Sequence, residues 1–259
     1  MRKCEYCGKE YVENKNIIPN LPEFMKEAIK YVPTCDCLEK KKHEEFAALA
    51  RQYDEESRRN RVKKYRDISI IDKKFYESKF ENAENIPVIN LLKKYSEKFK
   101  SIGTAPSGLF LYGSVGTGKT YAASCLANDL MANGKTVLFM SFALYLIKIR
   151  EGFKNYSEET NIESEILKHV KTCDLLIIDD LGIENVKEFA AEKLFTLLDT
   201  RYRTKKPFVI TTNLSIEAIK EKFGERICDR INGSTYKYEC KGESRRKTNE
   251  KSFIDWLMA

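Results

Sequence analysis

The stretch that decides the fold is Leu109-Phe110-Leu111-Tyr112-Gly113-Ser114-Val115-Gly116-Thr117-Gly118-Lys119-Thr120. An apolar run with strand character leads into a glycine-rich turn that fits the pattern G-x-x-x-x-G-K-[ST], and a helix-favouring run, 121–127, follows directly. A chance glycine turn is the alternative interpretation. The strand–turn–helix context favours a P-loop, the turn that binds the phosphates of a nucleotide.

The chemistry of phosphate binding explains these residue types. A polyphosphate is wrapped by backbone N–H groups at a helix N-terminus, where the helix dipole favours negative charge, and glycine lets the backbone come close enough. Lys119 is expected to reach the β- and γ-phosphates, and the Thr120 hydroxyl to bind Mg²⁺. The predicted nucleotide-binding residues are Gly113, Ser114, Val115, Gly116, Thr117, Gly118, Lys119, Thr120 and Tyr121.

Charge and composition narrow the class of protein. Charged residues make up 33% of the 259 residues, and the formal net charge is +7. The first hundred residues hold 23 Lys and Arg against 18 Asp and Glu, an excess of +5 that lies outside the P-loop region. This excess permits a polyanionic partner, although a charge run is usually a solvated helix face. The N-terminus has no apolar signal-peptide core and no segment approaches 18 apolar residues, so we expect a cytoplasmic protein without a membrane partner.

The N-terminal segment, 1–38, carries two close cysteine pairs, Cys4-x-x-Cys7-Gly8 and Cys35-x-Cys37. Disulfides are rare in the cytosol, so paired cysteines are first interpreted as metal ligands, and four thiolates predict a closed, structural Zn²⁺ site. His43 competes for a ligand position because Cys-x-Cys departs from the commoner spacing. Four free thiols are the alternative. A redox pair is less favoured because no thioredoxin-like pattern surrounds the cysteines.

A charged segment without glycine or proline, 39–67, follows this module. Phe46, Leu49, Ala50 and Tyr53 lie at helical spacing, which predicts a long, mostly solvated helix with one narrow apolar stripe. It is either a connector and partner-binding helix or a helix that packs against the zinc module. The remaining residues, 68–259, form the predicted ATPase domain.

Two later strands carry polar residues at their C-terminal ends. The run Leu175 to Ile178 ends in Asp179-Asp180, the Walker B pattern, in which Asp179 holds Mg²⁺ and Asp180 polarises the attacking water. Helix N-capping is the alternative for two such acids. A second apolar strand, 207–213, ends in Asn213, whose amide could orient that water or, alternatively, belongs to a simple turn.

The order of these elements predicts the fold class. Strands alternate with helices and are apolar without alternation, which indicates an α/β fold with a parallel β-sheet flanked by helices. The order of P-loop, acid-tipped strand and polar-tipped strand is typical of P-loop ATPases with an additional central strand. A small GTPase is disfavoured because the Asn-Lys-x-Asp guanine motif is missing from the sequence.

Basic residues near the C-terminus are further candidates. Arg226 and Arg230 are four residues apart, so they lie on one helix face. In a monomer they are solvent charges, whereas in a ring or spiral one of them can enter the neighbour's nucleotide site as an arginine finger. The basic loop 241–247 is either an ordinary exposed turn or a contact for nucleotide phosphates or DNA.

With these motifs, the chain resembles the bacterial replicative helicase loaders of the DnaC/DnaI type, which are AAA+ ATPases with a variable helicase-binding N-terminal region. The resemblance covers about 65–259 and rests on the motifs 113–120, 176–182, 211–214, 224–230 and 242–246. A cysteine-ligated N-terminal module before a long helix is also similar to members of that family.

The resemblance implies roles for several residues. Asn213 takes the sensor-1 role, Arg230 that of the arginine finger with Arg226 as its companion, and Arg246 that of the sensor-2 arginine. The implied partners are a DnaB-type replicative hexameric helicase, single-stranded DNA and further copies of the chain. The insertion between the strand at Thr136 and the Walker B strand is implied to face DNA; its basic and aromatic residues are Lys148, Arg150, Phe153, Lys154 and Tyr156.

One residue departs from the general AAA+ pattern. Walker B usually ends in Asp-Glu, whereas this chain has Asp179-Asp180, and the shorter second side chain predicts a slow, switch-like ATPase. The expected function is therefore ATP-dependent loading of a helicase onto single-stranded DNA. The alternatives are an IstB-type transposition helper ATPase and a zinc-binding adaptor that binds nucleotide without turnover.

Overall fold

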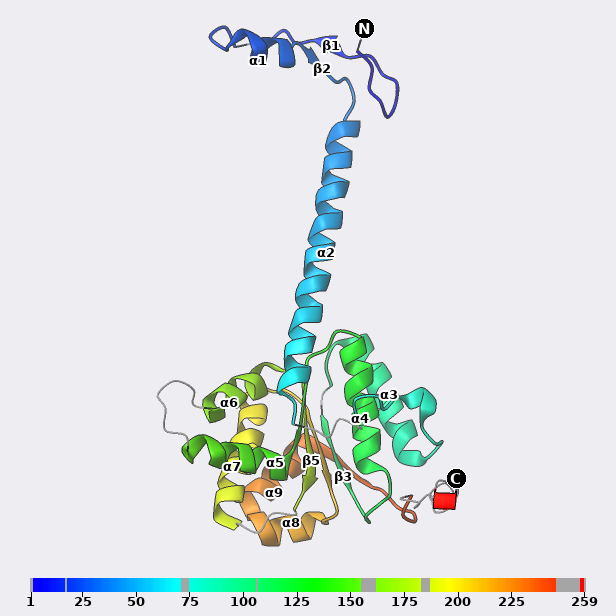
Figure 1. Ribbon diagram of the computed structural model, residues 1–259, viewed down its shortest axis with the longest axis vertical. Helices are drawn as coiled ribbons and strands as arrows, with labels where there is room; N and C mark the ends of the chain where they lie inside the picture. The colour runs from blue at the N-terminus through cyan, green and yellow to red at the C-terminus, as the bar shows by residue number, and fades with distance from the viewer. Residues whose placement is uncertain are drawn as a thin grey trace. The chain divides into compact units, whose positions relative to one another are not determined.

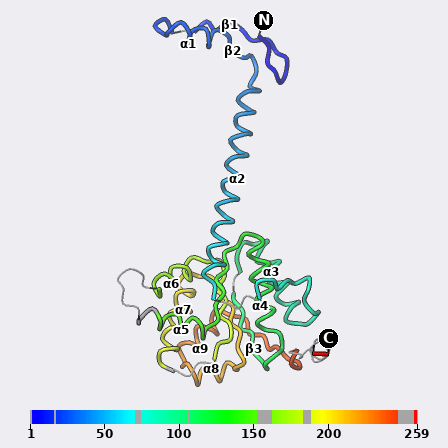
Figure 2. The backbone as a smooth tube through the Cα atoms, viewed as in Figure 1, coloured from blue at the N-terminus to red at the C-terminus, as the bar shows by residue number. Residues whose placement is uncertain are grey.

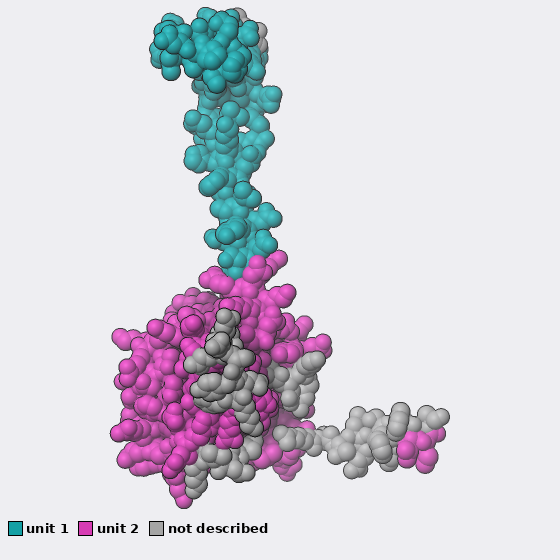
Figure 3. Space-filling view, turned by 60° about the vertical axis from the view of Figure 1, so that its left-hand side comes forward, with its two compact units in different colours: residues 1–58 teal, residues 59–259 magenta. Residues whose placement is uncertain are grey.

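The computed structural model describes residues 2–16, 18–70, 75–105, 107–154, 162–182, 187–245 and 257–258 (Figures 1 and 2). The chain divides into two compact units, residues 1–58 and residues 59–259 (Figure 3). Within the described ranges, every helix is too short or too polar to cross a membrane. The division into a zinc module, a connector helix and an ATPase domain at residues 38 and 67 stays a prediction.

The first unit has very little apolar core. Strand β1 (Val12–Glu13) pairs antiparallel with β2 (Tyr31–Val32), and the short helix α1 (Glu23–Ala28) lies between them in the chain. Among the described residues of this unit, Cys4 is the only one that is buried. Two short strands and one short helix cannot bury enough surface to offset the chain entropy lost on folding, so this unit needs another source of stability.

Helix α2 (Cys37–Ile68) runs from the first unit into the second. It contains neither glycine nor proline, so nothing in its interior breaks the hydrogen-bond ladder. Phe46, Leu49 and Tyr53 are exposed, as expected for a narrow apolar stripe on a solvated helix. Near its end, Tyr65 is buried, and its hydroxyl hydrogen-bonds the Thr172 hydroxyl at 2.6 Å.

The second unit is built on a five-stranded parallel sheet. Its strands are β3 (Gly108–Tyr112), β4 (Val137–Ser141), β5 (Leu175–Leu181), β6 (Phe208–Thr212) and β7 (Thr235–Glu239), in the spatial order β4-β5-β6-β3-β7. Strand β6 lies between the P-loop strand β3 and the acid-tipped strand β5. The predicted additional central strand and the α/β fold class are therefore confirmed.

Helices cover both faces of this sheet (Figure 1). Alternate strand residues contact the helices of one face or the other; Leu109 and Phe110, for example, belong to different cores. Because both faces are covered, the strands are apolar throughout, as predicted. One face packs on α3 (Pro87–Ile102) and α4 (Lys119–Ala132), and the other on α5 (Phe142–Lys154), α6 (Ile162–Thr172), α7 (Lys187–Arg203), α8 (Ile216–Phe223) and α9 (Glu225–Ser234).

Arg201, near the end of α7, connects the end of α6 to the N-terminal ends of two neighbouring strands of the sheet. Its side chain is fully buried, and its Nη1 and Nη2 atoms donate to four backbone carbonyls, those of Val170, Cys173, Asp174 and Pro207, at 2.6–3.1 Å. These carbonyls lie at the end of α6 and just before β5 and β6. Arg201 thus holds the starts of the two strands whose other ends form the site described next.

Candidate nucleotide-binding site

The phosphate loop connects β3 to α4 and depends on glycine geometry. Gly113, Gly116 and Gly118 have φ of 135°, 83° and 89°, a region that side chains other than glycine rarely adopt. A Cβ atom at Gly113 would lie 2.4 Å from the carbonyl oxygen of Cys240. Glycine is therefore required here both by the turn and by the chain segment packed against it.

Lys119 is the first residue of α4 and folds back over the loop. Its Nζ atom donates to the carbonyl oxygens of Gly113 and Ser114 at 2.8 and 2.7 Å, and the residue is 6% exposed. The first N–H groups of a helix have no partners within the helix, so the start of α4 offers donors to an anion beside this ammonium group. The loop and Lys119 together form an anion-binding turn of the predicted kind.

Thr211 on β6 positions the two acidic residues at the end of β5. The pairing of β5 with β6 shifts between Ile178 and Leu181, so Asp179 and Asp180 lie in a bulge, and Asp180 has a φ of 58°. The Thr211 hydroxyl donates to Asp179 Oδ1 at 2.5 Å and accepts the backbone N–H of Asp180 at 3.1 Å. One hydroxyl therefore holds the carboxylate of Asp179 and the backbone of Asp180.

Asp179 lies in an environment suited to a divalent cation. It is 6% exposed, and burial raises the pKa of its carboxyl to about 6, against hydrogen bonds from Thr211 and Thr120 and the charge of Lys119. The hydrogen bond from Thr120 brings the two predicted Mg²⁺ ligands together. A buried carboxylate beside a hydroxyl is a set of hard oxygen ligands, and a cation there would remove the cost of ionising Asp179. The residues therefore fit the expected metal.

A cavity of about 920 Å³ opens beside the phosphate loop. Its volume is within the usual range for small-molecule sites, and it combines polar groups with an apolar wall, as a nucleotide requires. Asp180 and Asn213 lie in its lining together with the loop. The lining residues are Phe75, Asn82, Glu84, Ile86, Ile89, Val115, Gly116, Thr117, Gly118, Lys119, Thr120, Tyr121, Asp180, Asn213 and Arg245.

Two of the predicted arginines, Arg226 and Arg230, lie away from this cavity. Arg226 is exposed on α9. Arg230 is partly exposed; its Nε lies 3.3 Å from Asp199 Oδ1, and its guanidinium lies 4.4 Å from the centre of the Tyr202 ring. Neither arginine lines the cavity of its own chain. Arg246 lies outside the described residues.

The predicted DNA-facing residues are described only in part. Lys148 and Arg150 are exposed on α5, and the Arg150 guanidinium lies 5.0 Å from the centre of the Phe189 ring. The side chains of Phe153 and Lys154, and the whole of Tyr156, lie outside what the structure describes.

No individual role was predicted from the sequence for Thr211, Glu84 or Arg245. Thr211 is one of two threonines that end an otherwise apolar strand, and its two bonds depend on the pairing of β5 with β6. Glu84 lies in a segment without a motif that would single it out. Arg245 lies in the basic loop 241–247, for which a phosphate contact was one of two interpretations, and the fold brings both residues to the cavity.

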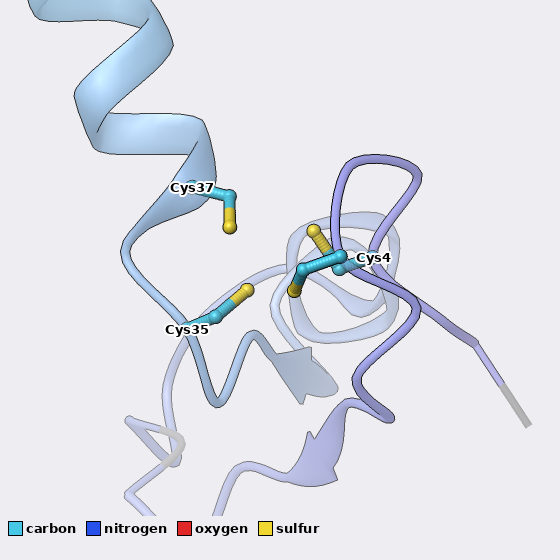
Figure 4. Close-up of side chains that lie close together, drawn as sticks. Cys4, Cys35 and Cys37 are labelled. Carbon is cyan, nitrogen blue, oxygen red and sulfur yellow. The ribbon is translucent and has the colours of Figure 1, made fainter.

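The four N-terminal cysteines form a compact group. The sulfur atoms of Cys4, Cys7, Cys35 and Cys37 all lie within 4.8 Å of one another, and Figure 4 shows those of Cys4, Cys35 and Cys37 pointing toward a common centre. Tetrahedral Zn²⁺ with four thiolates places the sulfurs about 3.8 Å apart. Backbone hydrogen bonds from Tyr6 and Cys7 lower the pKa of Cys4 to about 7, whereas hydrogen bonds with the Cys7 and Cys35 thiols raise the pKa of Cys37, so in the metal-free group Cys4 is the thiol that ionises more readily. His43 is not part of the group.

Comparison with known proteins gives a family match and several relatives. The family model described as IstB-like ATP binding protein matches residues 35–252. The replicative helicase loader DnaC of Escherichia coli (strain K12) is 30% identical over 139 residues, which are 54% of this chain and 54% of that protein. The replicative helicase loader DnaI of Bacillus subtilis (strain 168) is 30% identical over 137 residues, 52% of this chain and 41% of that protein. The chain thus spans about half the length of the curated relatives it matches.

Solved structures agree with the fold. The crystal structure of the DnaC helicase loader has a TM-score of 0.56 and 22% identity over 66% of this chain and 100% of that chain. The crystal structure of DnaI has a TM-score of 0.55 and 23% identity over 68% of this chain and 94% of that chain. At these identities the likeness shows a common fold.

Proposed function

Because the chain belongs to the family of IstB-like ATP binding proteins, we propose that its second unit binds and hydrolyses ATP with Mg²⁺ in the cavity beside the phosphate loop. The observation that carries this proposal is the meeting of Lys119 and Thr120 with Asp179, which comes from a distant part of the sequence. Loop amides and Lys119 bind the phosphates, and Thr120 and Asp179 hold Mg²⁺, which neutralises charge on the transferred phosphoryl group. Asp180 and Asn213, at the ends of neighbouring strands, orient the attacking water.

The chain is further proposed to load a hexameric replicative helicase onto single-stranded DNA. Support comes from the relatives, which are named replicative helicase loaders. The N-terminal region is the proposed helicase-binding part, with the exposed side chains of Phe46, Leu49 and Tyr53 on α2 available for contact. ATP can shift the equilibrium between the helicase-bound and the released chain only if its affinity differs between these two states. Slow hydrolysis suits such a switch because the ATP-bound state then persists.

Self-association would complete the nucleotide site. Arg230 is the proposed arginine finger, with Arg226 beside it, because both lie outside the cavity of their own chain. In the free chain Asp199 and Tyr202 hold Arg230, so assembly must exchange these contacts for the neighbour's phosphate. For Arg230→Ala, we expect ATP affinity to stay within about threefold while DNA-stimulated hydrolysis falls by about a thousandfold or more. Unchanged stimulated hydrolysis would remove the finger role.

A steady-state assay of phosphate release tests the ATPase. The full chain, with Mg²⁺ and with or without single-stranded DNA, is expected to turn over slowly, and Lys119→Ala to abolish turnover because the phosphates lose their main cation. Glu239→Gln, which changes an exposed side chain on β7, is the control. Turnover that persists in Lys119→Ala would disprove the assigned site, and binding without turnover in the wild type would support the adaptor alternative.

Capture by the immobilised full chain tests the partner. We expect retention of a DnaB-type hexameric helicase at micromolar concentration, with ATP present, and a weaker signal from Phe46→Ser/Leu49→Ser. Glu55→Gln on the same helix is the matched surface variant. A chain that retains a transposase but no helicase would instead support the transposition-helper function.

A further inference from the structure

The chain segment that follows β7 is fastened to the phosphate loop. At its start, the backbone N–H of Cys240 donates to the carbonyl oxygen of Tyr112 at 2.6 Å. At its end, the backbone N–H of Arg245 donates to the carbonyl oxygen of Gly116 at 2.9 Å. A Cβ atom at Gly116 would lie 2.1 Å from Ser244 Oγ, so the contact is close. These bonds fix the backbone of Arg245 beside the turn that is proposed to hold the phosphates.

The side chain of Arg245 reaches across to Glu84. Its Nη1 atom bonds Glu84 Oε2 although the two residues are 161 positions apart in the sequence. Both residues line the cavity, and among its described lining residues Arg245 and Lys119 are the cations and Glu84 and Asp180 the acids. The second cation of the cavity therefore rests on a carboxylate in the nucleotide-free chain.

We propose that Arg245 binds the phosphates of the nucleotide and that Glu84 is its partner only while the site is empty. The inference rests on the proposed nucleotide-binding function and adds a residue to it, distinct from Arg246. Binding would exchange the carboxylate of Glu84 for phosphate oxygens, while the backbone bond of Arg245 to Gly116 stays in place. Glu84 thereby competes with the ligand for one guanidinium group.

The energetics favour this exchange. The side chains of Arg245 and Glu84 are 43% and 73% exposed, and exposed ion pairs contribute about 0–1 kcal/mol. A polyphosphate carries several negative charges and offers the paired oxygens that the planar guanidinium of arginine binds best. A single, solvated carboxylate is thus a weak competitor, strong enough to hold Arg245 in the empty site and weak enough to release it.

A double-mutant cycle with two ligands tests the exchange. Binding of ATP with Mg²⁺ and of adenosine is measured by calorimetry for wild type, Glu84→Gln, Arg245→Ala and the double variant of the full chain. We expect Glu84→Gln to tighten ATP binding about threefold, since it removes a weak, solvated competitor. Arg245→Ala should weaken ATP about tenfold or more, and Glu84→Gln should have no further effect in that background. Adenosine has no phosphate, so its affinity should stay the same throughout.

Each other outcome overturns the inference. If Glu84→Gln tightens ATP equally with and without Arg245, Glu84 acts by direct repulsion of the phosphates. If it weakens ATP and adenosine alike, Glu84 is a ligand of the nucleoside. If Arg245→Ala weakens ATP binding less than about threefold, Arg245 does not contact the phosphates. Arg245→Lys keeps the positive charge and much of the side chain, so it is the control for misfolding: a folded lysine variant that binds ATP better than the alanine variant shows that the charge itself contributes.

Two controls separate this inference from the proposed function. Glu239→Gln removes another exposed ion pair, Glu239 with Lys241, from the same part of the chain but outside the cavity, and should leave ATP affinity unchanged. Lys119→Ala should abolish ATP binding. If it does not, the proposed nucleotide site itself is wrong, whereas a normal Lys119→Ala result with no effect at Arg245 contradicts only the exchange.

Discussion

The Thr211 hydroxyl hydrogen-bonds both acidic residues of the candidate site. In Thr211→Val the methyl group keeps the volume, but Asp179 loses a donor and the N–H of Asp180 loses its acceptor. We expect the rate of ATP hydrolysis to fall about tenfold, equivalent to about 1.4 kcal/mol, while ATP affinity changes less than threefold. Phosphate release and calorimetry measure the two effects.

Thr211→Ser is the matched control because it keeps the hydroxyl and removes only a methyl group. It should retain most of the wild-type rate. Equal losses in Thr211→Ser and Thr211→Val would show that packing, rather than hydrogen bonding, is the contribution of this residue.

Asp179 makes the stability of the metal-free protein depend on pH. Its pKa is about 6 in the folded chain and 3.8 in the unfolded reference, so its stabilising contribution is complete below pH 4 and is lost as pH rises through 6. The loss amounts to about 3 kcal/mol at pH 8. Asp179→Asn cannot ionise, so in EDTA we expect it to melt higher than wild type, and the difference to grow between pH 5 and pH 8.

Circular dichroism melts at the two pH values measure this difference. Asp174→Asn, at the other end of β5, is a control for removing an acidic residue. A difference in melting temperature that stays constant with pH would show that Asp179 is not the titrating group.

At the scale of single residues, the sequence predicted the site residues that belong to a motif, and it did not predict the hydrogen bonds that form only in the folded chain. Lys119, Thr120 and Asp179 were identifiable because phosphate and Mg²⁺ chemistry demands those residue types after particular strands. Thr211 and Arg245 act through bonds to segments that are distant in sequence, and no local pattern encodes such bonds.

At the scale of elements, the strands were the most predictable part. The expected strand at Thr136 is β4, Val137–Ser141, and the expected strand at 207–213 contains β6, because uninterrupted apolar runs identify a sheet buried on both faces. Helix ends were harder to predict: α2 begins at Cys37 and ends at Ile68, whereas the predicted helical segment was 39–67. Local propensity changes little over the last turn, so a helix end depends on what it packs against. The bulge in β5 had no pattern of its own.

Arg201 shows how one side chain can hold several elements. We expect Arg201→Lys to destabilise the protein by about 3 kcal/mol, because a lysine offers fewer donors in a different geometry and leaves buried carbonyls without partners. Thermal melting of the nucleotide-free chain measures the loss.

Arg203→Lys is the neighbouring control. The side chain of Arg203 is 78% exposed and pairs with Asp199, so this change should cost about 0–1 kcal/mol. If both variants melted at the same temperature, the four carbonyl bonds of Arg201 would contribute no more to stability than a surface ion pair.

At the scale of the whole molecule, the two units depend on different sources of stability. The second unit has two extensive apolar cores, one on each face of its sheet. The first unit has one buried cysteine among its described residues and a group of four thiols. A structural Zn²⁺ site contributes about 10 kcal/mol or more, far more than so small a core can supply. We therefore expect the stability of the first unit to depend on bound metal and that of the second unit to depend on its apolar cores, each independently of the other.

Removal of metal tests this independence. We expect the purified chain to contain one equivalent of zinc, and chelation to make 1–36 sensitive to protease while a fragment close to 59–259 survives and still binds ATP. Cys7→Ser should lose zinc in the same way, because it leaves three ligands. Cys228→Ser, a buried thiol of α9 outside the group, should keep it. Zinc retained by Cys7→Ser would exclude the four-cysteine site, and loss of ATP binding on chelation would show that the second unit also depends on the metal.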